Sequence, residues 1–189
     1  MRSNARIIFS APSGAGKTTL VKLVLEELPE LAFSVSCTTR KPRENEVEGK
    51  DYYFISREEF EAEIARGAFV EYEEVYSGTL YGTRRAELDR LAVAGKVPVF
   101  EVDVKGGLKL KQIFGADALT IFIQPPSIAE LRRRLTSRGT EAPEEIERRI
   151  ARAEAELREA PNFDESVVNE NLYDAVSECL ARIRTFLYE

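Results

Sequence analysis

The chain has 189 residues, 43% of them hydrophobic, and a formal net charge of −6. This length suits one compact domain with a buried core, and the hydrophobic content argues against disorder. An acidic surface repels a phosphate backbone, so general nucleic-acid binding is disfavoured. The apolar runs are too short to cross a membrane and the N-terminal segment lacks the pattern of a secretory leader, so we expect a cytoplasmic protein without a membrane partner.

Histidine is absent, and the two cysteines, Cys37 and Cys179, lie far apart in the sequence. The absence of histidine removes the most common general base and any histidine-based triad or metal site. The cysteines do not have the spacing of a zinc site, and a disulfide is not expected in a reducing cytosol. Any chemistry must therefore proceed without an imidazole.

The N-terminal part of the chain predicts a strand, a glycine loop and a helix. Residues 5–10 ("ARIIFS") are a short apolar run that indicates a buried strand. The segment "TTLVKLVLEELPE" has apolar residues at helical spacing, and Pro29 closes that helix. Residues 32–35 are a second short strand candidate.

Residues 36–83 differ from the flanking segments in composition and patterning, which indicates a small inserted subdomain. A polar segment rich in turn residues comes first, followed by a strand-like run over 52–56. A short helix then begins with a capping box, Ser56 and Glu59, and ends at Gly67. Residues 69–76 alternate as a half-buried strand does.

An alternation of helices and strands returns in the remainder of the chain. Predicted helices and strands follow in the order helix 84–94, strand 97–103, helix 106–114, strand 118–124, helix 127–137, strand 166–169 and helix 172–188. Ser127 and Glu130 form a second capping box. The charged stretch 138–160 has few large apolar residues, so we expect it to be exposed and mobile. Strands alternating with helices predict an α/β fold with a parallel sheet covered on both faces.

The segment "FSAPSGAGKTTL" (9–20) nearly matches the phosphate-loop pattern G-x-x-x-x-G-K-[ST]. Backbone N–H groups of such a turn, opening onto a helix N-terminus, bind anions, with Lys17 reaching the β and γ phosphates and the Thr18 hydroxyl reaching Mg²⁺. Ala11 stands where the pattern has its first glycine. An alanine is tolerated at this position if its φ is negative or if the surrounding structure absorbs the backbone strain. The alternative is an ordinary turn with a chance lysine, which the flanking strand and helix disfavour.

Further motifs follow the loop: "SVSCTTRKPRENEVEGKDYYF", "FVEYEEVYSGTLYGT", "EVDVKGG", "PPS" and "RRRLTSRGTE". In this order, from Ile7 to Asn169, they resemble the guanylate kinases. The resemblance implies transfer of the γ-phosphate of ATP to GMP, with dGMP as a further acceptor, and Mg²⁺ as cofactor. It also implies a P-loop NTPase-like parallel sheet with a GMP-binding insert and a helical lid. The expected division of the single domain 1–189 is a core of 1–33, 84–126 and 160–189, an insert of 34–83 and a lid of 127–159.

The same resemblance assigns the site residues. The expected ATP contacts are Ala11, Pro12, Ser13, Gly14, Ala15, Gly16, Lys17, Thr18, Thr19 and Asn169. The expected GMP contacts are Ser36, Arg40, Arg43, Tyr52, Glu71, Tyr81, Thr83 and Asp103. The expected catalytic residues are Lys17, Arg40, Arg134, Arg138 and Arg149. At the metal, Thr18 is the expected ligand, and Glu101 is a candidate to act through a water.

Physical chemistry supports these assignments. The acceptor is already an anionic phosphate oxygen, so positioning and charge neutralisation suffice and no strong base is needed. Guanidinium forks suit phosphate, although Arg40 and Arg43 alone could be a solvated basic loop. A carboxylate at Glu71 can accept both the N1–H and the 2-amino group of guanine. The simpler alternative is that Glu71 is one of several acids on the wet face of a strand, with Glu73 and Glu74.

Several other arginines lie near the expected lid, and the sequence departs from the family pattern at two positions. The neighbours Arg132, Arg133, Arg148 and Arg152 are expected to be solvated or paired with glutamate at i, i+4. Glu101 stands where the family usually has aspartate, and Lys105 stands where it usually has glutamine.

Three competing functions remain open to test. A guanylate-kinase-like protein-binding module would have lost parts of the nucleotide loop, which are present here. A kinase for another phosphate ester, such as ribose bisphosphate, would lack the base-reading set of Ser36, Glu71 and Thr83. AMP and UMP kinases lack the motifs of the insert.

Overall fold

The computed structural model describes residues 2–76, 78–137 and 142–189. The chain divides into two compact units, of which the first comprises residues 1–29 and 101–189 and the second residues 30–100. Among the described residues, no helix is long and apolar enough to cross a membrane.

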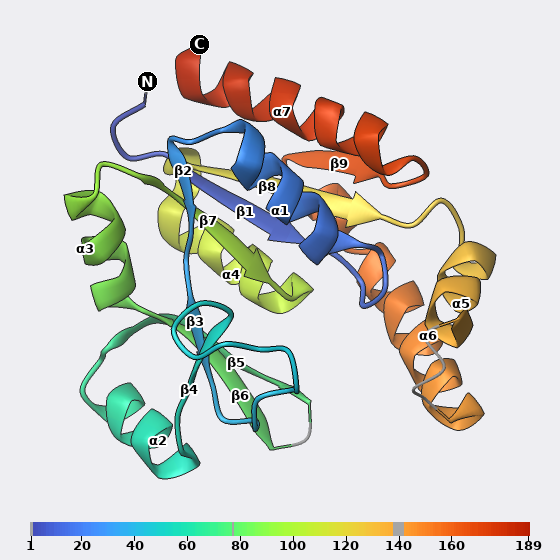
Figure 1. Cartoon of the computed structure of the whole chain (residues 1–189), viewed down its shortest axis with the longest axis horizontal. Helices are drawn as coiled ribbons and strands as arrows, with labels where there is room; N and C mark the ends of the chain where they lie inside the picture. The colour runs from blue at the N-terminus through green and yellow to red at the C-terminus, as the bar shows by residue number, and fades with distance from the viewer. Residues whose placement is uncertain (1, 77, 138–141) are drawn as a thin grey trace. The chain divides into compact units, whose positions relative to one another are not determined.

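A parallel sheet forms the centre of the first unit, with helices on both of its faces (Figure 1). Its middle strand, β8, pairs with β1 on one side and β9 on the other. Helices α1 and α7 pack against each other on one face, and α4 packs on the other. The bounds are β1 (Arg6–Ser10), α1 (Lys17–Glu27), α4 (Val104–Phe114), β8 (Ala118–Gln124), β9 (Glu165–Val168) and α7 (Leu172–Tyr188). The prediction of a parallel sheet covered by helices is confirmed, because strands buried on both faces are apolar throughout.

The second unit contains a small mixed sheet in the order β4-β3-β6-β5. Strand β3 runs parallel to β4 and antiparallel to β6, and β5 and β6 form an antiparallel pair. Beneath the sheet, Phe60 stacks on Phe69 with ring centroids 4.4 Å apart, next to Cys37 and Leu80. The bounds are β2 (Leu31–Phe33), β3 (Ser36–Thr38), β4 (Tyr52–Phe54), α2 (Arg57–Ala65), β5 (Phe69–Tyr76), β6 (Thr79–Arg84) and α3 (Arg85–Val93). Strand β7 (Val97–Val102) begins in this unit and pairs in parallel with β2.

Most predicted elements are confirmed within one or two residues at their ends. Ser56 accepts a hydrogen bond from the Glu59 N–H (3.1 Å), and Ser127 accepts one from the Glu130 N–H (3.0 Å), as the capping boxes predicted. Helix α4 begins at Val104, before the predicted 106, because the Asp103 carboxylate caps it by accepting the Gly106 N–H. Strands β3 and β6 were not predicted, since β3 has only three residues and β6 lacks a continuous apolar or alternating pattern.

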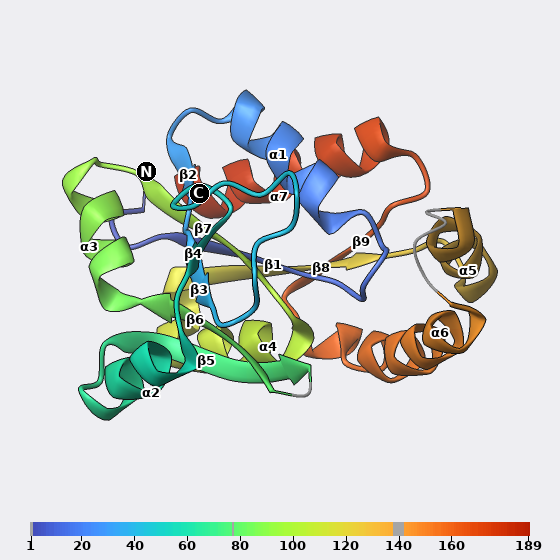
Figure 2. The ribbon, with the colours of Figure 1, turned by 60° about the horizontal axis from the view of Figure 1, so that its bottom comes forward.

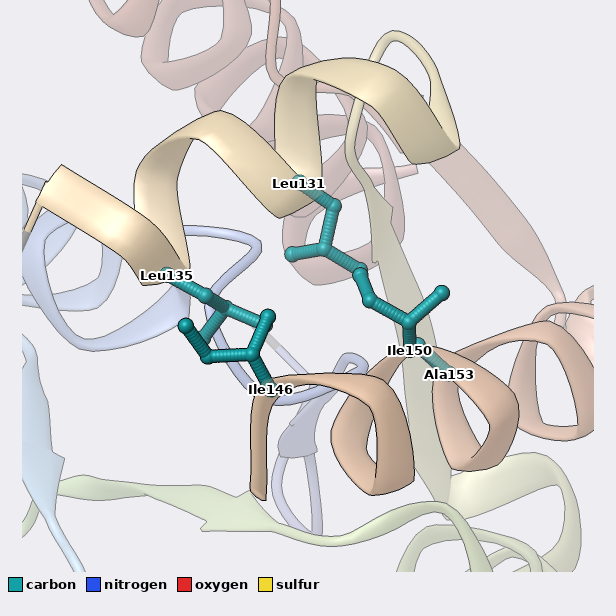
Figure 3. Close-up of a cluster of buried hydrophobic side chains, with 5 residues drawn as sticks. All are labelled: Leu131, Leu135, Ile146, Ile150 and Ala153. Carbon is teal, nitrogen blue, oxygen red and sulfur yellow. The ribbon is translucent and has the colours of Figure 1, made fainter. Parts of the chain in front are cut away.

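The expectation that 138–160 is exposed is wrong for one face of the described part of this stretch, which is a packed helix. Residues 143–157 form the regular helix α6 (Pro143–Leu157), which lies beside α5 (Ile128–Ser137), as Figure 2 shows. Three residues of α6, Ile146, Ile150 and Ala153, are buried against Leu131 and Leu135 of α5 (Figure 3). Their spacing places them in one stripe of the helix, and one narrow stripe is enough to pack a helical hairpin.

Candidate active site

The phosphate loop connects the end of β1 to the start of α1 in the first unit. Gly14 and Gly16 have φ values of 91° and 92°, a conformation that glycine adopts without penalty. No described residue other than glycine has a positive φ, so Ala11 sits in the loop without backbone strain. No side chain caps α1, whose N-cap is Gly16. The first turn of this helix is therefore suited to an anion.

Both loop glycines also lie close to side chains of other segments. A Cβ atom at Gly14 would lie 2.9 Å from side-chain carbons of Leu131 and Leu135, and one at Gly16 would collide with the side-chain amide of Asn169. The loop is thus packed directly against α5 and against the residue that follows β9.

Lys17 and Thr18, the first two residues of α1, are held by the last two residues of β7. The Lys17 Nζ donates to the Val102 carbonyl at 2.5 Å, and the Thr18 hydroxyl is hydrogen-bonded to Oε1 of Glu101. Burial lowers the pKa of Lys17 from its ordinary value, and the nearby carboxylates of Glu101 and Asp103 oppose that shift. The Glu101 carboxylate therefore reaches the Thr18 hydroxyl at the start of α1.

Two further carboxylates, Asp103 and Glu156, interact electrostatically with Lys17, and Arg152 lies against both of them. Arg152 donates to Glu156 at 2.6 Å and lies 3.6 Å from Asp103. Burial raises the pKa of Glu156, although the hydrogen bond from Arg152 opposes it. The expected i, i+4 pairing of Arg152 is confirmed, but its contact with Asp103 was missed, and so was Glu156. Only the i, i+4 spacing could have pointed to Glu156 from the sequence.

Two of the three predicted lid arginines contact the phosphate loop or its neighbour Asn169. Arg134 donates to the Asn169 carbonyl (3.0 Å) and to the Ala15 carbonyl (3.4 Å), and Arg149 donates to the Ser13 hydroxyl (3.2 Å). The Asn169 amide also donates to the Ala15 carbonyl, at 2.8 Å. Arg138 lies outside the described residues.

The neighbouring arginines form exposed ion pairs instead. Arg133 and Arg148 pair with glutamates three residues before them, not at i, i+4. Arg132 pairs with Glu147 of α6, which joins the two helices of the hairpin. Exposed pairs of this kind contribute little to stability.

In the second unit, a cluster of aromatic rings surrounds the guanidinium of Arg40. Its Cζ lies 4.9 Å from the centroid of the Tyr52 ring and 5.7 Å from that of Phe54, and its Nε donates to the Tyr81 hydroxyl at 3.2 Å. Glu46 accepts from both terminal nitrogens at 2.6 Å. These hydrogen bonds raise the pKa of Arg40 and lower that of Glu46. Three of the predicted phosphate contacts, Arg40, Tyr52 and Tyr81, are thereby brought together, whereas Arg43 is exposed.

Burial distinguishes Glu71 from the other acids of β5. Its side chain is buried (4% exposed), whereas Glu73 is half-buried and Glu74 is exposed. Glu71 lies opposite Thr83 of β6, whose hydroxyl donates to the carboxylate at 2.9 Å. Ser36, on β3, is also buried. A buried carboxylate next to a hydroxyl is suited to a ligand with adjacent N–H donors.

The described residues contain no group of three carboxylate, cysteine or histidine side chains that could hold a metal ion alone. The first unit instead offers a phosphate loop, a half-buried lysine at a helix N-terminus and arginines directed at the loop. Together with the covered parallel sheet, these features are typical of a phosphate-loop phosphotransferase.

Comparison with known proteins identifies the family. The profile of the guanylate kinase family matches residues 3–185, and the chain belongs to that family. It is similar to the guanylate kinase of Bacteroides fragilis, with 51% identity over 181 residues that cover 96% of this chain and 89% of the relative. It has the same identity of 51% to the guanylate kinase of Salinibacter ruber, with 96% of each chain covered. A crystal structure of guanylate kinase from Anaplasma phagocytophilum has a TM-score of 0.80 at 30% identity, covering 98% of this chain and 87% of that one.

Proposed function

We propose that the residues described above carry out the transfer of the γ-phosphate of ATP to GMP, giving ADP and GDP. Membership of the guanylate kinase family makes the protein an ATP:GMP phosphotransferase acting on small molecules. The observation that carries the choice of acceptor is the buried Glu71 carboxylate with its hydroxyl partner Thr83. A buried acid left unpaired rejects the wrong base strongly, by roughly 10⁴-fold in comparable sites.

For ATP, the proposed site is the phosphate loop, residues 11–19. Its backbone N–H groups and the N-terminus of α1 would hold the phosphates, and Lys17 would neutralise the β and γ phosphates. The contacts of Arg134 and Arg149 with the loop support their role as lid arginines that neutralise charge on the transferring phosphoryl group. Arg138 completes this set by resemblance alone. Asn169, which borders the loop, is the proposed adenine contact.

Mg²⁺ is the proposed cofactor, and the residues present fit it. The Thr18 hydroxyl and the Glu101 carboxylate are hydrogen-bonded to each other, and hydroxyl and carboxylate oxygens are the hard ligands that Mg²⁺ prefers. Bound with ATP, Mg²⁺ supplies charge neutralisation at the β and γ phosphates. Thr18 would bind it directly, and Glu101 would hold a water of its coordination shell.

For GMP, the proposed site combines a phosphate half and a base half. The phosphate would be held by guanidinium and phenol donors, namely Arg40, Arg43, Tyr52 and Tyr81. The base would be read by Ser36, Glu71, Thr83 and Asp103. Glu71 would accept the N1–H and 2-amino protons of guanine, a pair of donors that adenine does not have. Asp103 caps α4 in the first unit, where its second carboxylate oxygen is still within reach of Arg152.

We further propose the functional division into a core (1–33, 84–126, 160–189), a GMP-binding insert (34–83) and a lid (127–159). The packing of α5 against α6 supports treating the described part of the lid as one helical hairpin. Closure of a lid excludes water, so that ATP is not simply hydrolysed. The cytoplasm is the proposed location, which agrees with two buried cysteines that form no disulfide.

The test is ADP production from ATP and Mg²⁺ with one acceptor at a time: GMP, dGMP, AMP, UMP, CMP or ribose 1,5-bisphosphate. We expect turnover with GMP, weaker turnover with dGMP and none with AMP. Binding of GMP by folded protein without any turnover would favour the protein-binding module instead. Turnover with AMP equal to that with GMP would contradict the role of Glu71.

A further inference from the structure

Glu46 makes a contact that neither the motifs nor the function explains. Its carboxylate lies against the terminal nitrogens of Arg40 in a bidentate pair, with both oxygen–nitrogen distances at 2.6 Å. The same carboxylate accepts the backbone N–H of Arg43 at 2.8 Å, and the Glu46 N–H donates to the Arg43 carbonyl at 3.1 Å. One side chain thus fixes the guanidinium of one phosphate-binding candidate and the backbone of the other.

The guanidinium of Arg40 is held by several partners at once. Arginine has five N–H donors. Four of those of Arg40 are engaged within the described chain, by the Tyr81 hydroxyl, the Lys41 carbonyl and the two oxygens of Glu46. Tyr52 and Phe54 stand within cation–π distance of its face. An arginine held in this way presents its remaining donor and its charge in one orientation.

We propose that Glu46 is a positioning residue for the phosphate of the acceptor nucleotide. It orders the guanidinium of Arg40 and closes the turn at Arg43 before the nucleotide arrives, so that binding does not have to order them. Because the Tyr81 hydroxyl accepts from Arg40, its own proton is left to donate to a phosphate oxygen. This inference rests on the proposed GMP site and adds to it a residue that would not touch the substrate.

Electrostatics alone predicts the opposite effect for Glu46. An acid close to a phosphate dianion repels it, so removing its charge should tighten the binding of GMP. If Glu46 acts by positioning, removing its charge should weaken that binding, since a long side chain must then be ordered at the moment of binding. The sign of the change therefore separates the two.

The experiment measures KM and kcat for both substrates in Glu46→Gln and Glu46→Ala, with Glu44→Gln as a matched control. Glu44 is two residues away in the same loop, is exposed, and its substitution makes the same change in charge. We expect KM for GMP to rise about 10-fold or more in Glu46→Gln, and further in Glu46→Ala, because two charge-assisted hydrogen bonds are weakened or lost. KM for ATP should change less than about 2-fold, and Glu44→Gln should leave KM for GMP unchanged or lower.

A double-mutant cycle tests whether Glu46 acts through Arg40. In an Arg40→Lys background, Glu46→Gln should raise KM for GMP much less than it does in the wild-type background. Inhibition by guanosine, which has no phosphate, should be the same in Glu46→Gln and wild type. An unchanged or lower KM for GMP in Glu46→Gln would overturn the proposal, as would equal losses for GMP and guanosine. Failure of the wild type to phosphorylate GMP would instead overturn the proposed function.

Discussion

The Thr83 hydroxyl donates a hydrogen bond of 2.9 Å to Oε1 of Glu71, across the β5–β6 pair, and both side chains are buried. The pair joins two positions that are 12 residues apart in the sequence. A buried carboxylate carries a large desolvation cost unless it is hydrogen-bonded, and the hydroxyl offsets part of that cost before any ligand binds.

Glu71→Gln should raise KM for GMP by about 100-fold or more while leaving KM for ATP nearly unchanged. The amide offers one acceptor and two donors, so it cannot accept both guanine protons and opposes one of them with its own. Steady-state kinetics with each substrate varied in turn measures the effect. Glu73→Gln, on the same strand, is the control, and an equal effect of the two substitutions would show that Glu71 does not read the base.

Lys17→Met should reduce kcat by about 1,000-fold or more without unfolding the protein. The ammonium neutralises charge on the phosphates in the transition state, and methionine has a similar length without the charge. Because burial already disfavours the charged lysine, its loss should not greatly lower the midpoint of thermal unfolding. Near-normal turnover in a folded Lys17→Met protein would disprove the assignment of the phosphate loop.

Ala11→Gly and Gly14→Ala should have very different effects, although both exchange the same two residue types in one loop. Ala11 has no positive φ, so glycine brings no relief of strain, and we expect turnover within about 2-fold of wild type and a loss of stability of about 0.5–1 kcal/mol. Gly14→Ala places a Cβ at a φ of 91° and 2.9 Å from leucine carbons, so ATP binding should be greatly weakened. Turnover and thermal melting measure both effects. A large gain in turnover with Ala11→Gly would mean that the alanine strains the loop.

Ile150→Ala should loosen the α5–α6 hairpin. Ile150 is 4% exposed and packs in the cluster with Leu131 and Leu135, so its truncation should cost about 2–5 kcal/mol of local packing (Figure 3). The substitution should accelerate amide hydrogen exchange more in α6 than in β1 or β8. KM for ATP should also rise, because Arg149 is carried by the same helix. Exposed Glu144→Ala is the control, and uniform acceleration of exchange across the chain would contradict a local effect.

Stability should depend on pH through Glu46. The hydrogen bond from Arg40 holds the pKa of Glu46 below its ordinary value of 4.5. The ionised carboxylate thus stabilises the folded state above that value, and this contribution is lost as the pH falls through the lowered pKa. We expect Glu46→Gln to reduce the free energy of unfolding by about 1–2 kcal/mol at neutral pH and by progressively less below about pH 4.5. Urea denaturation across this range measures the difference, and a difference that does not vary with pH would refute the assignment.

Local patterns predicted most of the fold but failed where contacts between distant segments decide the structure. Three elements were predicted with the observed bounds: the strands 69–76 and 118–124 and the helix 172–188. Their burial on one or two faces requires apolar residues at regular spacing or in a continuous run, and such patterns can be read from the sequence. The packing of helix α6 was not predicted, because only three apolar residues line its buried face in a highly charged segment. These three residues form a packing surface only because Leu131 and Leu135 of α5 lie against them.

The class of chemistry was already predictable from the residues, since the loop from Ala11 to Thr18 indicates phosphate binding and the absence of histidine excludes an imidazole base. The family was predictable as well, through the ordered motifs that follow the loop. The folded structure was needed to show that Glu71, and neither Glu73 nor Glu74, is the buried acid of β5, and that Glu46 pairs with Arg40. The physical reason is that burial and ion pairing depend on which segments meet in space, and residues of identical chemistry on one strand or loop become different only through those neighbours.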